Sequence, residues 1–203
     1  MAEILDHVTR VGLTPAAYVE LMTAQAAGDP ADFSEDEERE KLEFTKLNLH
    51  RTGRISRTWQ PTAELSALLD QMTTPQTWLV LTEPWCGDSA QCLPCLVKMA
   101  EPQPAITVQL VLRDTNLDLM DQYLTNGARS IPRLVAFDAQ GQELFQWGPR
   151  PAAAQEVFLA AKNEGLEKPD ILEKLHLFYG RNRGAALDAE FVSLLTAYLE
   201  DAR

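Results

Sequence analysis

The chemistry of this chain centres on a cysteine that follows a short apolar segment. Residues 78–81 are apolar and β-prone, which is typical of a strand buried on both faces, and residues 89–98 favour a helix. Cys86 lies between them, at the predicted helix N-terminus. Free amides and the positive end of the helix dipole favour the thiolate, the form of cysteine that attacks disulfides. We therefore predict an exposed, reactive thiol at Cys86.

Two neighbours of Cys86 act on this thiol in opposite directions. Ser89 lies about one helical turn further on, where its hydroxyl can hydrogen-bond a thiolate but cannot form a disulfide. Asp88 carries a negative charge, which disfavours the thiolate and raises a thiol pKa. The sequence leaves the net shift open, and an inert Cys86 is the alternative. An outside thiol would have to resolve any mixed disulfide that Cys86 forms.

The other two cysteines, Cys92 and Cys95, form a Cys-Leu-Pro-Cys run that by itself is typical of a redox or metal motif. Both fall inside the predicted helix, where cysteine behaves as a small buried hydrophobe. Cys92 lies a helical rise of roughly 9 Å beyond Cys86, whereas a disulfide needs Cα atoms within roughly 7 Å. A role for Cys92 as a resolving thiol therefore requires local unwinding, which Pro94 makes easier. No second Cys or His pair accompanies the run, so we predict no metal site.

The elements around these residues alternate between helix and strand, as in crossover-connected α/β structure. We predict strands over residues 78–81, 106–112, 134–137 and 143–147, the last two antiparallel. We predict helices over 14–27, from Ser34 onward through 49, and over 62–72, 85–100, 117–124, 151–162, 170–179 and 185–198. Thr14 is the expected N-cap of the first helix.

Several motifs, in this order, resemble the thioredoxin superfamily. Residues 85–89 read Trp-Cys-Gly-Asp-Ser and are similar to the family's Trp-Cys-Gly-Pro-Cys motif, with Asp88 in place of proline and Ser89 in place of the second cysteine. Residues 127–137 are similar to the segment that holds the family's cis-proline, with Pro132 in that role. The whole chain resembles a bacterial subgroup with monothiol Cys-x-x-Ser character and helical extensions.

This resemblance implies a thioredoxin-like fold, a three-layer α/β/α arrangement with a mixed central sheet and added helices at both ends. The implied organisation is a helical extension over residues 1–58, a thioredoxin-like domain over 59–165, and a C-terminal helical extension over 166–203 packed on the same domain. Trp59 and Trp147 are expected to pack in the core or between these parts.

The resemblance also implies roles for residues of the site. Cys86 and Ser89 would be catalytic. A cis Pro132 would place the backbone of Ile131 beside Cys86, where an extended substrate could pair with it. Substrate contacts would also come from Trp85, Gly87 and Asp88. Thioredoxins carry a buried carboxylate on the central strand; Val80 stands at that position here, and we expect Glu83 to lie nearer the surface.

Composition narrows the function classes. A net charge of -12 argues against a nucleic-acid partner, and we interpret the basic residues Arg51, Arg54 and Arg57 as a solvated helix end. The sequence has neither an apolar core of signal-peptide length near its start nor a run able to cross a bilayer. Three cysteines then indicate free thiols in the cytoplasm.

Two functions fit these observations. The leading hypothesis is a thiol oxidoreductase of monothiol type without a bound cofactor, acting on protein or small-molecule thiols and disulfides, with an external thiol such as glutathione regenerating Cys86. The alternative is a non-catalytic thioredoxin-fold module that binds a protein or peptide. The substrate, the reductant and the oligomeric state are left open.

Overall fold

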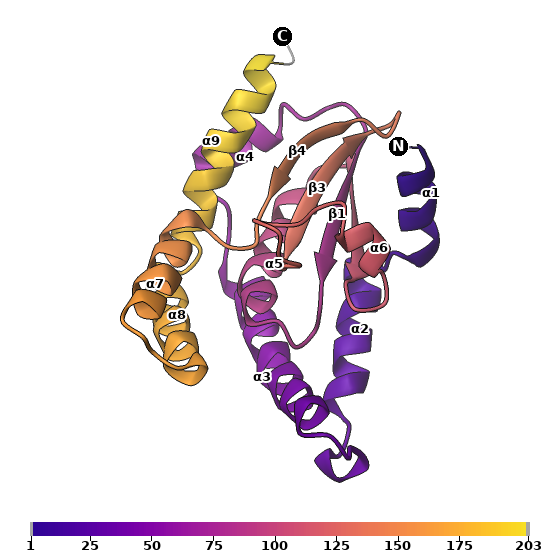
Figure 1. Cartoon of the computed structure of the whole chain (residues 1–203). Coiled ribbons are helices and arrows are strands. Elements are labelled where there is room, and N and C mark those ends of the chain that lie inside the picture. Colours follow the sequence, from indigo (N-terminus) through magenta and orange to yellow (C-terminus); the bar gives the residue numbers. More distant parts are fainter. Residues whose placement is uncertain (1, 202–203) are drawn as a thin grey trace.

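The computed structural model describes residues 2–201 and is built around one mixed sheet (Figure 1). The strand order is β2-β1-β3-β4. β1 pairs in parallel with β2 and antiparallel with β3, and β3 pairs antiparallel with β4. The strands are β1 (Gln76–Thr82), β2 (Ile106–Leu112), β3 (Arg133–Asp138) and β4 (Glu143–Trp147). All four predicted strands are confirmed.

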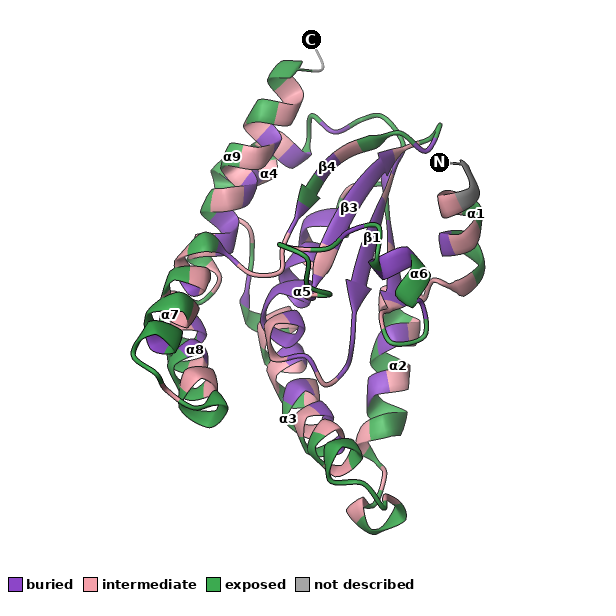
Figure 2. Cartoon of the chain, viewed as in Figure 1, coloured by how far each residue is buried: buried purple, intermediate pink, exposed green. Residues whose placement is uncertain are grey.

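The central strand β1 is buried on both faces, because its side chains alternate between two cores. Trp78 and Val80 pack in one core with α4 (Ala63–Leu69), α5 (Gly87–Ala100) and α9 (Ala185–Asp201). Leu79 and Leu81 pack in the other core with α1 (Ala2–Val11) and α6 (Leu117–Met120). β1 and β3 are accordingly mostly buried in Figure 2, whereas the edge strand β4 is more exposed. The predicted three-layer α/β/α class is confirmed.

The added helices surround this unit. Before the sheet come α2 (Pro15–Ala26), a short 3-10 turn η1 (Pro30–Asp32) and α3 (Asp36–Thr58), and α3 packs against both α2 and α5. After it, α7 (Ala152–Asn163) and α8 (Lys168–Asn182) pack as a pair, beside the sheet in Figure 1. Across residues 2–201, no helix has the length and apolar character needed to span a bilayer.

Some predicted helix ends differ from the structure. Thr14 caps α2 as predicted, since its hydroxyl accepts a hydrogen bond from the amide of Ala17 at 3.2 Å. The capped start predicted over residues 34–37 is shifted by one residue, because Glu35 and not Ser34 is the N-cap and α3 begins at Asp36. The predicted helix over 117–124 is too long. α6 ends at Met120, and the chain then turns through paired backbone hydrogen bonds between Thr125 and Ala128.

A buried carboxylate joins the C-terminal helix α9 to the start of α4. Asp188 is 5% exposed, and its two oxygens accept hydrogen bonds from the amide of Thr62 at 3.0 Å and from the Thr62 hydroxyl at 2.7 Å. The same hydroxyl caps α4 by accepting from the amide of Leu65. The polar contact between α9 and the start of α4 thus depends on this one carboxylate.

We expect Asp188→Ala to lower the free energy of unfolding by about 1–3 kcal/mol, because it removes the two hydrogen bonds that the buried carboxylate accepts from Thr62. Asp188→Asn, which keeps one carbonyl acceptor, should lose less. Urea unfolding followed by circular dichroism measures both. Glu156→Ala on the exposed side of α7 is the control and should change little. A loss from Asp188→Ala no greater than the control's would contradict the anchoring role.

Candidate functional site

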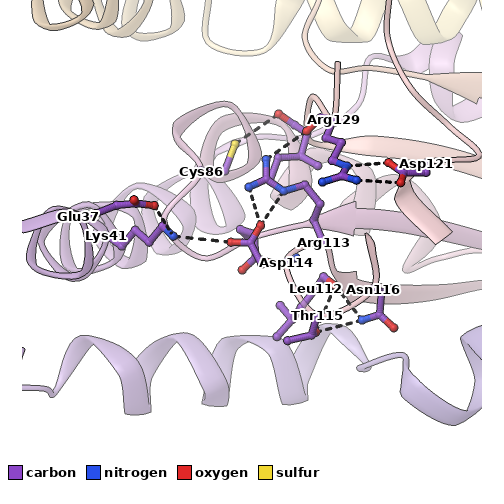
Figure 3. Close-up of polar contacts among 12 residues, drawn as sticks. Glu37, Lys41, Cys86, Leu112, Arg113, Asp114, Thr115, Asn116, Asp121 and Arg129 are labelled. Atoms are coloured by element: carbon purple, nitrogen blue, oxygen red, sulfur yellow. Dashed lines mark hydrogen bonds and ion pairs between the residues drawn. The ribbon is translucent and has the colours of Figure 1, made fainter. Parts of the chain in front are cut away.

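Cys86 is the N-cap residue of α5, and its sulfur has two backbone partners. Sγ lies 3.5 Å from the amide nitrogen of Ser89, which donates to it. As a thiol it donates to the carbonyl oxygen of Ile131 at 3.4 Å, the contact drawn from the Cys86 sulfur in Figure 3. The Ile131–Pro132 peptide bond is cis. The structure therefore brings Cys86, Ser89 and Ile131 together.

The predicted exposure of Cys86 is wrong. Its side chain is 8% exposed and belongs to the apolar core that contains Leu81 and Met120. Burial raises the pKa of the Cys86 thiol to about 11, and the charge of Asp88 adds to this shift, against the hydrogen bonds from Ser89. The net pKa shift of Cys86, which the sequence left open, is thus upward, because desolvation raises the pKa more than the amides at the helix N-terminus lower it. At neutral pH the thiol is protonated.

Ser89 is buried beneath this thiol. Its hydroxyl accepts a hydrogen bond from the hydroxyl of Thr82, at the end of β1, at 2.8 Å. The phenol of Tyr18 in α2 lies 3.5 Å from the same Thr82 hydroxyl. Both the amide and the hydroxyl of Ser89 favour the thiolate of Cys86, so Ser89 stabilises the reactive form without offering a second thiol.

Asp88, where the resembling motif has proline, makes the densest polar contacts of the site. One carboxylate oxygen accepts from Nε and Nη2 of Arg150 at 3.0 and 2.6 Å. The other accepts from the hydroxyl of Tyr179 in α8 at 2.5 Å. The guanidinium of Arg150 also lies 4.6 Å from the ring centre of Phe158 in α7. Asp88 thus binds the motif to the α7–α8 pair, and the sequence showed neither partner.

Trp85 lies beside the Cys86 thiol, and two cationic side chains lie over its indole ring. The guanidinium of Arg113 lies 4.9 Å from its ring centre, and the ammonium of Lys41 in α3 lies 5.6 Å away. Both cations contact Asp114, and Arg113 donates to the carbonyl of Arg129 at 3.1 Å (Figure 3). These contacts join α3, the end of β2 and the segment before the cis proline around one indole.

The buried face of α3 also holds the junction between β1 and α5. Asn48 is fully buried, and its side-chain amide donates to the carbonyl oxygen of Pro84 at 3.0 Å. Its own carbonyl accepts from Arg51. Sequence reasoning did not single out Asn48. A polar residue on the apolar face of a helix was the available signal, because a buried amide needs partners.

Glu83 lies deeper than predicted. Our expectation that it is nearer the surface is wrong, because it is 6% exposed and its carboxylate accepts a hydrogen bond from the amide of Asp114 at 2.7 Å. Burial raises the pKa of Glu83 to about 7, and the Asp114 amide partly opposes this. Val80 is fully buried in the apolar core, as its side chain requires. A buried carboxyl is thus present, three residues beyond the position expected from the resemblance.

Cys86 lines a cavity of about 990 Å³, which we call the thiol cavity. Its walls come from α3, the start of α5, the segments 113–117 and 129–131, Arg150 and α8. Trp85, Gly87, Asp88 and Ile131 line it with Cys86. Pro132 does not; its carbonyl is instead approached so closely by Gly148 that a Cβ there would lie 2.2 Å away.

Cys92 lies away from this cavity. It is 1% exposed in the core on the other face of the sheet, and its sulfur lies 3.9 Å from the hydroxyl of Tyr179. Burial raises the pKa of Cys92 well above the usual value. Cys92 and Cys95 both line a smaller cavity, described below, that Cys86 does not reach. The structure therefore places the three thiols free and in two separate environments.

Asp88→Asn should lower the pKa of Cys86 by roughly one unit, because it removes a buried negative charge beside the thiol. The measurement is the pH dependence of Cys86 alkylation by iodoacetamide, followed by mass spectrometry. Tyr179→Phe is the matched variant: it removes the hydroxyl that binds Asp88 and keeps the charge, so the pKa should not fall. Equal profiles for Asp88→Asn and the wild type would refute the electrostatic role.

Ionisation of Glu83 should lower the stability of the protein as pH rises between the pKa values of this carboxyl in the unfolded and folded states. The unfolded carboxyl ionises near 4.5 and the folded one near 7, so the folded state holds a proton that the unfolded state has released. Glu83→Gln stays neutral and keeps an acceptor for Asp114. Its loss of unfolding free energy between about pH 5 and pH 8 should be smaller than the wild type's by roughly 1–2 kcal/mol. Urea titrations at both pH values, with Glu156→Gln as control, measure this. Parallel losses in all three proteins would contradict it.

Comparisons with known proteins agree with this architecture. The family model described as thioredoxin matches residues 36–164. Two crystal structures are similar at 19% identity: an HIV epitope scaffold (TM-score 0.57, covering 95% of this chain and 97% of that one) and a Pseudomonas aeruginosa protein of unknown function (TM-score 0.55, covering 97% and 96%). They support the fold alone. No curated protein matches the sequence. Since the family model covers more than half of the chain, the protein belongs to the thioredoxin family.

Proposed function

We propose that the protein is a thiol-disulfide oxidoreductase of monothiol type in which Cys86 is the nucleophile. The observation that carries the proposal is the setting of the Cys86 sulfur, at a helix N-terminus, 3.5 Å from the Ser89 amide and beside the Ile131 carbonyl. This sulfur lines a cavity of about 990 Å³, which is large enough for a peptide segment or a small disulfide.

The proposed reaction has two exchange steps. The Cys86 thiolate attacks a disulfide of the substrate, which forms a mixed disulfide on Cys86 and releases the other sulfur as a thiolate that takes up a proton. An external thiol such as glutathione then attacks the mixed disulfide and returns Cys86 to the thiol. Ser89 cannot supply that second thiol, so each turnover consumes one external thiol and yields a disulfide that joins this thiol to the substrate sulfur that Cys86 had held. With glutathione and a glutathionylated substrate, that product is glutathione disulfide.

The substrate contacts follow from the lining of the thiol cavity. Trp85 offers an aromatic border, and the backbone of Ile131, set by the cis Pro132, offers main-chain groups to an extended segment. Gly87 leaves room: a Cβ there would lie 3.3 Å from Cε1 of His176 in α8. Asp88 acts on the thiol through its charge. Three free cysteines suit a reducing compartment, and we place the protein in the cytoplasm on that ground.

A second function is favoured by a specific observation. The Cys86 thiol is 8% exposed and its pKa is about 11, whereas efficient exchange is favoured by a thiol pKa near the ambient pH. In this second function the thiol cavity binds an extended peptide or protein segment, and Cys86 is part of its wall. The two functions make opposite predictions for the reactivity of Cys86.

As an oxidoreductase, the wild type incubated with glutathione disulfide should gain one glutathionyl group, on Cys86, at a rate that increases as pH rises toward about 11. Ser89→Cys should instead form a disulfide between residues 86 and 89, because position 89 contacts the Cys86 sulfur. Intact-mass spectrometry with peptide mapping detects both products. Cys86→Ser is the control and should remain unmodified. A wild type that stays reduced at about pH 9, together with a Ser89→Cys variant that forms no disulfide, would contradict the oxidoreductase function and favour the binding function.

A further inference from the structure

A second cavity, of about 510 Å³, lies where α3, α5, α8 and the start of α9 meet. We call it the arginine cavity, after Arg54 and Arg183 in its wall. Its inner side is formed by Cys92 and Cys95, and Tyr179 is shared with the thiol cavity. Figure 1 shows how these elements bring together parts of the chain that are distant in sequence. The proposed function uses no other residue of this wall.

The two arginines are the charged groups of the wall. Their side chains are exposed, and neither forms an ion pair with any residue in the described part of the chain. The residues that line the cavity include no aspartate or glutamate. The thiol cavity differs in this respect: Arg150 there is bound to Asp88 and Lys168 to Glu40. On a chain of net charge -12, two guanidiniums therefore face one cavity whose lining offers them no acidic partner.

Two further donors of the wall have no hydrogen-bond partner among the described residues. Gln91 is 8% exposed, and its side-chain amide forms no hydrogen bond with a residue that the structure describes. Trp59 is 7% exposed, and its indole N–H likewise has no acceptor among residues 2–201, whereas those of Trp78 and Trp147 both do. The donor atoms of both side chains still reach solvent, so they are available to an acceptor bound in this cavity.

The helix ends beside the cavity do not cancel its positive charge. α3 ends at Thr58 and α8 at Asn182, so two C-termini lie beside the wall, each equivalent to roughly half a negative charge. The two guanidiniums carry two full positive charges. The N-terminus of α9 at Ala185 adds roughly half a positive charge. The Asp188 carboxylate subtracts one: burial raises the pKa of Cys95 in the wall, and this charge raises it further. The sum is about half a positive charge, and the positive groups are the ones that line the cavity.

We propose that the arginine cavity binds an oxyanion, a carboxylate or a phosphate, carried on a flat apolar group. Arg54 and Arg183 would bind the oxyanion at the rim, and Gln91 would donate from the wall. The flat group would lie against apolar residues of the wall, among them Ile55 and Leu187. A guanidinium group can pair with two oxygens of a carboxylate or of a phosphate through two parallel hydrogen bonds.

The test is an NMR titration of the full-length protein with phenyl phosphate and, separately, with benzoate. The indole N–H of Trp59, assigned with a Trp59→Phe variant, reports binding in the arginine cavity. We expect the chemical shift of this N–H to change saturably with at least one probe. The probe that binds more tightly identifies phosphate or carboxylate as the preferred group. Arg54→Gln/Arg183→Gln should weaken binding at least about tenfold, and Gln91→Leu should weaken it too.

Arg57→Gln/Arg181→Gln is the matched control. It removes the same charge from α3 and from the last turn of α8, next to the C-cap residue Arg183, at exposed positions that do not line this cavity. Binding that remains in this control and is lost in Arg54→Gln/Arg183→Gln supports the proposal. Equal weakening in the two double variants, or no saturable shift with either probe, overturns it. Because the readout does not involve Cys86, these results are independent of the redox test.

Discussion

The burial of the Asp88 carboxylate is the constraint on which the rest of the site depends. Its side chain is 10% exposed, and a charge removed from water to that extent requires close partners. It obtains them from Arg150 and from Tyr179, which lie far along the chain. The α7–α8 pair is thereby held over the start of α5. The same charge helps to keep the nearby Cys86 thiol protonated.

This arrangement explains why the added helices matter to the chemistry. A bare sheet-and-helix unit would leave the N-cap of α5 open to water, but here α3 and α8 supply walls of both cavities. Asn48 of α3 fixes the carbonyl before Trp85, while Tyr179 of α8 lies between the two cavities. Occupation of the arginine cavity would thus contact the same phenol that binds Asp88, a physical connection between the two sites.

Much of the fold and part of the site could be predicted, because their signals are local in sequence. The apolar run of β1, the Thr14 cap and the placement of Cys86 between strand and helix are of this kind. Glu83 shows where local reasoning fails: a carboxylate just beyond a buried strand was expected to turn outward. It is covered instead, and the amide of Asp114, reached only through the parallel pairing of β1 with β2, satisfies it.

The sequence by itself determined the order of strands and helices, the family, and the nucleophile candidate with a serine where a second thiol would stand. These depend on spacing, propensity and side-chain identity, which are properties of the chain. Tertiary structure alone decided the burial of Cys86, the partners of Asp88 and the convergence of Arg54 with Arg183. Desolvation and charge pairing act between groups that are close in space, and residues 62 or more positions apart in sequence, such as Asp88 and Arg150, become neighbours only when the chain has folded.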